Sequence, residues 1–469
     1  MFFFIFFSFT NILRMSKIIF LFSLVIFIPL IQTEEKKEEE IKFVFQMHRH
    51  GARAPFTGVE NGKDCYKEDW ISNGELSEVG KRQHYLLGVR NRKRYMDDYK
   101  FLNKNYDPQE ILIYSTNVKR TIQSIYSQLQ GLYPEGYGKE IPINLNDEKV
   151  TRPKFSNYTE FFQEIEEKYF SGANKYYALP NKINVAPVHI FYLPDHQVQL
   201  HDYKNCPKLK DDYFKMLNKS DIVQNFRDTL KKEFRVFFES LEGQNDTFLN
   251  DYWDIYKYMD TLKVDETDGR NLEAIIKLLN DSQIKRFREL SDKFLFMDYY
   301  NINYNKTIVA QLSMSNTMKT IIKYMDGIVN NKQISKVKYL IYSMHDSTFG
   351  GMEVFNNITF GTQIEYAKFA ENGFYELYKA TNGSFYVRLM IKDQLRKTMS
   401  YEEFKQKAES KILSDEQINE KCGFTSNNFM KYILIILIII NAILIIAVIL
   451  GIVGKKNKFE SHEYISFNC

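Results

Sequence analysis

The chain has 469 residues, a hydrophobic fraction of 44% and a formal net charge of +4. This composition is typical of a folded protein with enough apolar side chains for one large domain or two ordinary ones. The small net charge argues against a protein that binds nucleic acid through a global positive field. Any anion-binding site must therefore be a local cluster of cationic side chains.

Two apolar blocks, residues 1–9 and 18–30, begin the chain and are separated by a short stretch that contains Met15 and Lys17. If translation starts at Met15, Lys17 is the charged region of a secretory signal peptide and 18–30 is its apolar region. We therefore expect residues 1–33 to be a cleaved signal peptide. A retained N-terminal anchor is the alternative.

A second long apolar run, 432–454, consists almost entirely of Ile, Leu, Val and Ala, and Asn441 is its only strongly polar residue. Its length is that required to cross a bilayer as a helix. Three lysines follow within a few residues, so the positive-inside rule places a tail of residues 455–469 in the cytosol. The sequence predicts a type I membrane protein whose domain, 34–428, is lumenal or extracellular.

Glycosylation sequons and cysteines agree with that location. Asn-x-Ser/Thr sequons lie between the two apolar segments, at Asn157, Asn218, Asn245, Asn280, Asn305, Asn357 and Asn382. The cysteines of the same region are Cys65, Cys206 and Cys422, whereas Cys469 lies in the tail. An odd number predicts one disulfide and one free thiol as the simplest arrangement.

Strands and helices alternate in the first part of the domain. The apolar run 41–45 predicts a strand, and the glycine and proline after it predict a loop that presents cationic side chains. Residues 76–95 predict a helix with Ser77 as its N-cap. A second strand is expected at 110–115, followed by a helix to about residue 129.

From about residue 145 to 304 the sequence changes to long, charged, helix-forming stretches, with a short strand signal only at 186–193. This pattern predicts a helical cap inserted into an α/β domain. A helix at 308–325 and a third strand at 337–343 follow the cap.

The remainder of the domain begins with two alternating runs, 373–379 and 384–391, on either side of an Asn-Gly turn. That combination predicts a β-hairpin. Residues 397–411 are expected to form the last helix before the apolar run.

Three of the predicted strands end in loops that carry ionisable side chains. Such strand ends meet at one edge of an open α/β sheet. Arginine is suited to phosphate and carboxylate because its planar fork donates parallel hydrogen bonds, and a cluster of three requires a ligand with about two negative charges. The side chains are those of Arg49, His50 and Arg53 after the first strand, Arg120 after the second, and His345 and Asp346 after the third.

The order and spacing of these residues resemble the histidine acid phosphatases, most closely the prostatic and lysosomal branch. The resemblance is carried by three segments, 49–55, 115–121 and 345–346, and extends over most of the domain. It implies a phosphoglycerate-mutase-like three-layer α/β sandwich with a mixed central sheet and an inserted cap. It also implies hydrolysis of phosphomonoesters without a metal or another cofactor.

The resemblance implies a role for each site residue. His50 would attack phosphorus to give a phosphohistidine, and Asp346 would protonate the leaving alcohol. The nearby guanidinium groups disfavour an imidazolium and keep His50 nucleophilic in acid, whereas a bound phosphate dianion favours protonated Asp346. The groups that would hold the phosphoryl oxygens are those of Arg49, Arg53, Arg120 and His345.

The resemblance further implies a disulfide between Cys206 and Cys422 and small phosphomonoesters as substrates. Two alternatives stay open: a narrower phosphatase for inositol phosphates or lysophosphatidate, and an inactive phosphatase-fold glycoprotein that acts in binding or adhesion. A homodimer is also left open. The tail segment from Tyr464 to Phe467 matches a sorting signal, which favours the endosomal and lysosomal route but does not exclude the cell surface.

Other candidate residues have simpler interpretations. His48 matches no role in the family and is expected to pack at the strand end. Ala52 and Tyr114 replace residues common in relatives but are not assigned to the chemistry. A surface or loop position is expected for His201 and Asp202, and a metal site is not expected from His189, His196, His201 and Asp202, because their spacing matches no known site.

Overall fold

The structure is a computed structural model. It describes residues 39–55, 74–141, 164, 168–169, 171–172, 176–191, 206–208, 221–242, 249, 252–269, 279–300, 306–332, 336–358, 367–423 and 428–460. Several of the expectations above lie outside these residues: the signal peptide 1–33, Cys65, Cys469, four sequons (Asn157, Asn218, Asn245, Asn305), His196, His201, Asp202 and the segment from Tyr464 to Phe467.

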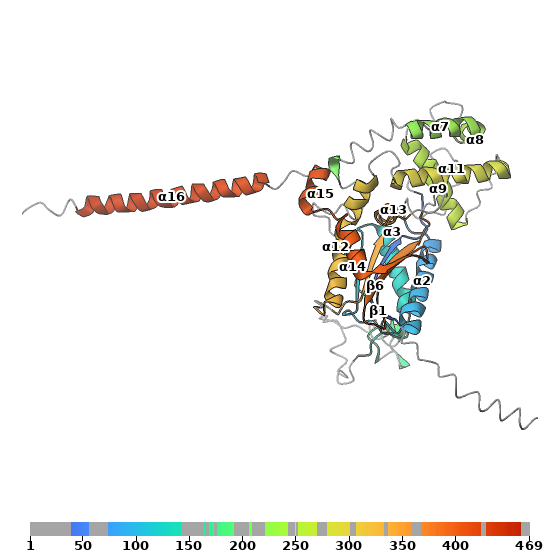
Figure 1. Ribbon diagram of the computed structural model, residues 1–469, viewed down its shortest axis with the longest axis horizontal. Coiled ribbons are helices and arrows are strands. Elements are labelled where there is room, and N and C mark those ends of the chain that lie inside the picture. The colour runs from blue at the N-terminus through green and yellow to red at the C-terminus, as the bar shows by residue number, and fades with distance from the viewer. Residues whose placement is uncertain are drawn as a thin grey trace, which may run out of the picture.

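A mixed sheet of seven strands, in the order β3-β2-β4-β1-β5-β6-β7, forms the centre of the described fold (Figure 1). The four strands β3, β2, β4 and β1 run parallel to one another. The strands β5, β6 and β7 run antiparallel to their neighbours. The strands are β1 (Glu40–Arg49), β2 (Ile111–Ser115), β3 (His189–Ile190), β4 (Tyr339–Met344), β5 (Asn372–Lys379), β6 (Phe385–Ile391) and β7 (Gln394–Ser400).

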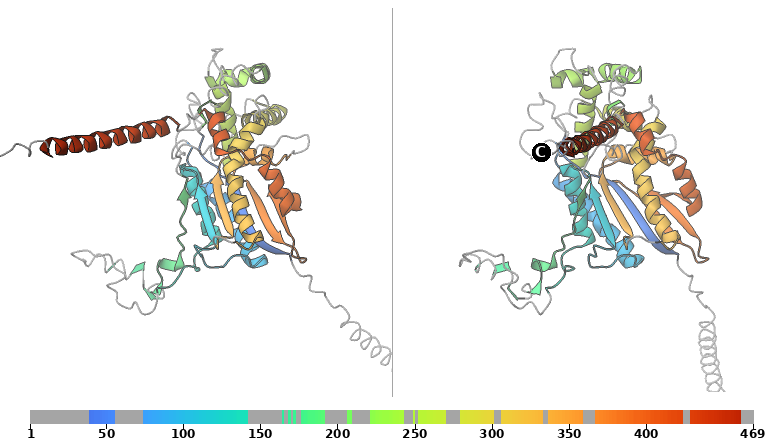
Figure 2. Two further views of the ribbon diagram at one scale, coloured as in Figure 1. Left: turned by 60° about the vertical axis from the view of Figure 1, so that its left-hand side comes forward. Right: turned by 90° about the vertical axis from the view of Figure 1, so that its left-hand side faces the viewer.

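Helices cover both faces of the sheet and produce three layers (Figures 1 and 2). Side chains alternate along a strand, so Phe43 and Phe45 of β1 pack on α12 (Lys306–Val329) and α14 (Tyr401–Glu409). Val44 packs on the opposite side with side chains of α3 (Lys119–Leu132). α2 (Glu78–Arg92), whose N-cap is Ser77 as predicted, packs beside α3.

The helices above the sheet pack around a second hydrophobic core, which also includes Leu312 and Ile418 from helices outside the cap. They are α7 (Asp221–Glu233), α8 (Arg235–Glu242), α9 (Tyr252–Asp268) and α11 (Asp281–Tyr300), and Figure 1 shows them at one end of the sheet. A disulfide between Cys206 and Cys422 attaches this cap to α15 (Asp415–Cys422), with the two Cα atoms 4.5 Å apart. Strand β3 lies within the range expected for the cap, yet it belongs to the central sheet.

The sequence-based prediction of a helix at 397–411 is wrong at its start. Residues 397–400 complete strand β7, and α14 begins only at Tyr401, where Ser400 accepts a hydrogen bond from the Glu403 amide. A second hairpin turn precedes β7, with positive φ angles of 53° at Lys392 and 59° at Asp393. The polar sequence of this edge strand lacks the apolar alternation that identified β6, and Lys-Asp is not a typical hairpin turn.

The predicted loop after the first strand also begins later than expected, because β1 continues through Arg49.

Three of the predicted sequons lie among the described residues. The side chains of Asn280, Asn357 and Asn382 are all exposed.

The last helix, α16 (Asn428–Glu460), extends away from the rest of the structure (Figure 1). The large apolar side chains from Leu434 to Leu450 are exposed along it. Within the described part of the chain, no helix combines the length and apolarity required for a membrane span.

Candidate active site

Three parallel strands end level with one another and place the predicted site residues together. In the sheet register Arg49 lies opposite Met344, and Ser115 lies opposite Ser343. The His50 amide donates a hydrogen bond of 3.0 Å to the Met344 carbonyl, so the chain leaves β1 in a fixed position. The ends of β1, β2 and β4 therefore form the floor of one site, below the cap.

The turn after His50 requires glycine. A Cβ atom at Gly51 would lie 2.5 Å from the carbonyl oxygen of Gly80, which belongs to the first turn of α2. The Gly51 amide also donates a 3.0 Å hydrogen bond to Ser124 Oγ of α3. This close approach seats the loop between α2 and α3 and fixes the direction in which His50 projects.

His50 is buried, with 1% of its surface exposed. Its Nδ1 lies 2.9 Å from the Gly51 carbonyl oxygen, which can only accept, so Nδ1 carries the proton and Nε2 keeps its lone pair. Burial, followed by the charges of Arg120, Arg49 and Arg53 and by His345, holds the pKa of His50 well below its usual value of 6.5. The imidazole is therefore neutral even in acid and presents a nucleophilic nitrogen.

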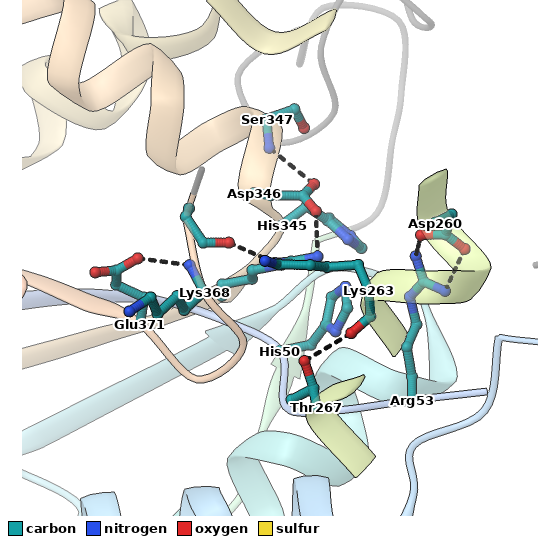
Figure 3. A network of polar contacts seen from close by, with 12 residues as sticks. His50, Arg53, Asp260, Lys263, Thr267, His345, Asp346, Ser347, Lys368 and Glu371 are labelled. Atoms are coloured by element: carbon teal, nitrogen blue, oxygen red, sulfur yellow. Dashed lines mark hydrogen bonds and ion pairs between the residues drawn. The ribbon is translucent and has the colours of Figure 1, made fainter. Parts of the chain in front are cut away.

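Arg49 and Asp346 form a buried ion pair beside His50. Arg49 Nη2 lies 2.6 Å from Asp346 Oδ2, and the Arg49 side chain is inaccessible to solvent. Arg49 also donates to the Ala367 carbonyl and stacks on the Phe369 ring at 4.0 Å. Asp346 is the first residue of α13 (Asp346–Phe355), and its Oδ1 accepts a 3.0 Å hydrogen bond from the Ser347 amide (Figure 3).

Arg53 projects into the same site but is paired with the cap. Its Nη1 and Nη2 lie 3.1 and 2.8 Å from the two carboxylate oxygens of Asp260 on α9. Both side chains are almost completely buried. Asp260 carried no signal in the sequence, because a single carboxylate in a charged helical stretch looks like a solvent-exposed residue.

Arg120 and His345 contact each other on the β2 side of the site. Arg120 Nη2 lies 3.3 Å from His345 Nδ1, and His345 Nε2 lies 3.0 Å from Thr116 Oγ1. Because a guanidinium can only donate, Nδ1 accepts and Nε2 carries the proton. Burial and then the charge of Arg53 lower the pKa of Arg120 to about 10, although Asp346 and Tyr256 act in the opposite direction.

The remaining histidines have other environments. His48 is fully buried and packs against His84 of α2 with ring centroids 4.7 Å apart, which agrees with the expected packing role. The His84 Nε2 lies 3.1 Å from the Arg49 carbonyl oxygen, so His84 supports the backbone from which the site residues project. His189 is exposed on β3. Among the described residues no group of three or more potential ligands could hold a metal ion.

The structure thus brings all six predicted residues into one site and adds Asp260, Thr116 and Phe369. Three guanidinium groups converge next to a neutral, buried imidazole, and a carboxyl group lies on the α13 side. Such a cradle can hold an oxyanion while an imidazole nitrogen attacks its central atom, because the charge of phosphoryl transfer is spread over the equatorial oxygens.

Comparison with known proteins agrees with this geometry. The family model of the histidine phosphatase superfamily (branch 2) matches residues 40–392, which include all six site residues. The lysosomal acid phosphatase of Xenopus laevis is 28% identical over 388 residues, which cover 81% of this chain and 74% of that protein. Human prostatic acid phosphatase is 27% identical over 333 residues, or 70% and 72% of the two chains.

Solved structures share the fold at much lower identity. The phytase of Klebsiella sp ASR1 has a TM-score of 0.53 and 13% identity, covering 81% of this chain and 97% of that one. The Hafnia alvei phytase in complex with myo-inositol hexakis sulphate has a TM-score of 0.51 and 13% identity, with coverages of 81% and 99%. The predicted resemblance is confirmed: the chain belongs to the histidine phosphatase superfamily, branch 2.

Proposed function

We propose that this protein is an acid phosphatase that hydrolyses phosphomonoesters through a covalent phosphohistidine. The observation that carries the proposal is the buried, neutral His50 with its unprotonated Nε2 enclosed by three guanidinium groups. A mere anion-binding site would gain from a protonated histidine, whereas a nucleophile requires the free lone pair.

The first step transfers the phosphoryl group to the protein. The ester phosphate enters the cradle of Arg49, Arg53 and Arg120, and His50 Nε2 forms a bond to phosphorus as the bond to the ester oxygen breaks. The phosphoryl oxygens displace Asp346 from Arg49, and the released carboxylate takes up a proton, from solvent or from the monoanion of the ester, which it then gives to the leaving alcohol.

The second step regenerates the protein. Water attacks phosphorus on the opposite side from His50, Asp346 accepts the proton of that water, and the bond between phosphorus and Nε2 breaks. Inorganic phosphate leaves, Asp346 gives up that proton as it pairs again with Arg49, and both side chains are then in their starting states. Because the transition states carry dispersed negative charge, the three arginines are expected to supply most of the acceleration, and the general acid a further ~10² to 10⁴.

The direct test compares the full-length protein with its His50→Ala and Asp346→Asn variants in hydrolysis of an aryl phosphate across acid and neutral pH. We expect wild-type activity in acid and a loss of at least ~10³-fold in His50→Ala, as is common when a nucleophile is removed. Wild-type hydrolysis no faster than that of His50→Ala would instead support the inactive binding or adhesion protein.

A broad set of small phosphomonoesters is the proposed substrate class. Inositol phosphates and lysophosphatidate are the narrower alternatives. The phytase complex with myo-inositol hexakis sulphate concerns a protein only 13% identical, so it supports the fold but does not select among esters. Parallel assays on an aryl phosphate, an inositol phosphate and a lysophosphatidate decide among them.

The proposed location is the secretory route, with a signal peptide at 1–33, the catalytic domain 34–428 in the lumen or outside, an anchor at 432–454 and a tail at 455–469. The Cys206–Cys422 disulfide supports an oxidising compartment, and the exposed apolar side chains of α16 support the anchor. Extraction of cell membranes with alkaline carbonate tests the anchor: an anchored protein stays in the pellet, and one truncated after residue 428 is released.

A further inference from the structure

Helix α9 of the cap contacts the loop that follows β1, residues 50–55, through one face. We call this segment the phosphate-binding loop. Asp260, Val264 and Asp268 follow at four-residue intervals and therefore lie on the same side of the helix. Asp260 pairs with Arg53, Val264 packs with Ala52 and Phe369, and Asp268 accepts a hydrogen bond from the hydroxyl of Ser77. Three consecutive turns of α9 thus hold the cap against the loop and the N-terminus of α2.

The central contact has the geometry of an orienting interaction. Both terminal nitrogens of Arg53 face the two Asp260 oxygens, at 3.1 and 2.8 Å, and Arg53 Nη1 also donates to the Ala54 carbonyl at 3.0 Å. A bidentate pair fixes the plane of the guanidinium group as well as its position. Because Arg53 is only 1% exposed, water does not offer it comparable alternative partners.

The orientation that results is suited to the site. Figure 3 shows Asp260 at the end of the Arg53 side chain, with the His50 ring to one side of that pair. A guanidinium has five N–H donors on different edges. A carboxylate that holds the end of Arg53 therefore sets the direction in which the other edges of the guanidinium group face.

We propose that Asp260 is a positioning residue for phosphoryl transfer, through which the cap becomes part of the phosphate cradle. The inference rests on the proposed function and adds to it a residue from a different element of the fold. Asp260 does not touch the reacting atoms. It acts through Arg53, whose guanidinium plane it holds in the direction that a phosphoryl oxygen requires.

Two effects of Asp260 oppose each other. Its negative charge weakens the attraction of the site for an anion, but its two hydrogen bonds keep Arg53 aligned. We expect alignment to dominate, because Arg53 already carries the compensating charge and a misdirected guanidinium donates no hydrogen bond to phosphate. Removal of Asp260 should therefore weaken phosphate binding.

The test measures the binding of inorganic phosphate by calorimetry to the full-length protein and its variants. Asp260→Asn preserves the volume of the side chain, and Asp260→Ala removes it. Glu233→Gln is the matched control, because Glu233 is a cap carboxylate in an exposed pair with Arg286. Thermal unfolding verifies that each variant is folded. If Asp260→Ala does not fold, the measurement on Asp260→Asn decides the question.

We expect phosphate to bind at least ~10-fold more weakly to the Asp260 variants and normally to Glu233→Gln, since charge-assisted bidentate bonds are strong. If Asp260 acts through Arg53, the double variant Arg53→Ala/Asp260→Ala should bind phosphate no more weakly than Arg53→Ala alone. Unchanged or tighter binding in Asp260→Asn, or a further loss in the double variant, would overturn the inference. A wild-type protein that binds no phosphate would contradict the proposed function instead.

Discussion

His50 and Asp346 occupy environments that separate their chemical roles. His50 is kept neutral by burial and by the surrounding cations. Asp346 is slightly exposed and is held by Arg49 at 2.6 Å, an interaction that an incoming phosphate can replace. One group is therefore ready to attack before substrate binds, whereas the other becomes a proton donor only in the presence of substrate.

The role of Asp346 can be tested with esters that differ in their leaving groups. An alkyl alkoxide needs a proton as it departs, but an aryl oxide with a low pKa does not. Asp346→Asn should reduce hydrolysis of an alkyl phosphate by ~10² to 10⁴ and that of a nitrophenyl phosphate by much less. Steady-state kinetics on the two esters measures the difference, and equal losses would argue against a general acid.

His84 predicts a pH dependence of stability. Burial lowers its pKa from 6.5 to about 4, although hydrogen bonds with the Arg49 carbonyl and Gln128 oppose the shift. Between these two pH values the unfolded chain binds a proton that the folded protein does not bind. The free energy of unfolding should therefore fall as the pH decreases from 6.5 to about 4, by up to about 3 kcal/mol from this group.

Urea unfolding of the wild-type protein and His84→Gln over this pH range checks that contribution. Glutamine keeps a side-chain N–H for the Arg49 carbonyl but has no titrating group, so the variant should lose less stability on acidification. His48 is also buried, and its pKa is lowered by burial and then by the charge of His84, so the variant also loses the part of the His48 contribution that depends on His84. Parallel curves for the two proteins would contradict the role given to His84.

At the scale of elements, the strands that carry the chemistry could be predicted because their apolar runs are strong and end in glycine, proline or charged residues. The Asn-Gly turn likewise identified the hairpin of β5 and β6. Strand β7 could not be identified from its sequence, which is polar and has no strand pattern of its own. The strand forms because it pairs with β6.

The site residues likewise divide into those that the sequence predicts and those that it does not. Six of its residues lie at the end of a strand or within a few residues after it in the chain, so they could be grouped by topology. Asp260 and His84 reach the site from helices, and only the packing of α9 and α2 against the loop brings them there. Helix–helix and helix–loop distances depend on the complete tertiary structure, and a local pattern does not contain them.

The pair α2 and α3 predicts a sensitive packing contact. A Cβ atom at Gly88 of α2 would lie 1.9 Å from the Gln128 carbonyl oxygen of α3. Gly88→Ala would force the two helices apart and should lower the free energy of unfolding by ~1–3 kcal/mol. Chemical denaturation measures this loss, and Lys81→Ala, at a more exposed position of α2, is the control that should change little.

The same variant should also lose activity while folded, because α2 and α3 flank the loop at Gly51 and α3 carries Arg120. A Gly88→Ala protein with wild-type stability and activity would show that the helices are less closely packed than the structure indicates.

At the scale of the whole molecule, the attachments of the cap include α9 on the phosphate-binding loop, α11 on α13 and the disulfide to α15. The cysteines are 216 residues apart in the sequence, so the bond restricts a very long segment of the unfolded chain. Loss of such a bond typically costs ~2–5 kcal/mol.

We therefore expect reductant to lower the unfolding temperature of the wild-type protein, and Cys422→Ser to have the same low unfolding temperature with or without reductant. Differential scanning calorimetry under oxidising and reducing conditions makes the comparison. A wild-type transition that does not respond to reductant would mean that the bond does not stabilise the folded state.

The central claim is that His50 forms a covalent bond with phosphorus. Its most direct test is to mix the full-length protein with an aryl phosphate, quench the reaction in alkali, where phosphohistidine survives, and examine the peptide that contains His50 by mass spectrometry. We expect a phosphoryl group on His50 that forms in the wild-type protein, is absent from His50→Ala and accumulates when the release of phosphate is slowed. Hydrolysis that proceeds at the wild-type rate in the His50→Ala variant, or a phosphoryl group found on another residue, would contradict it.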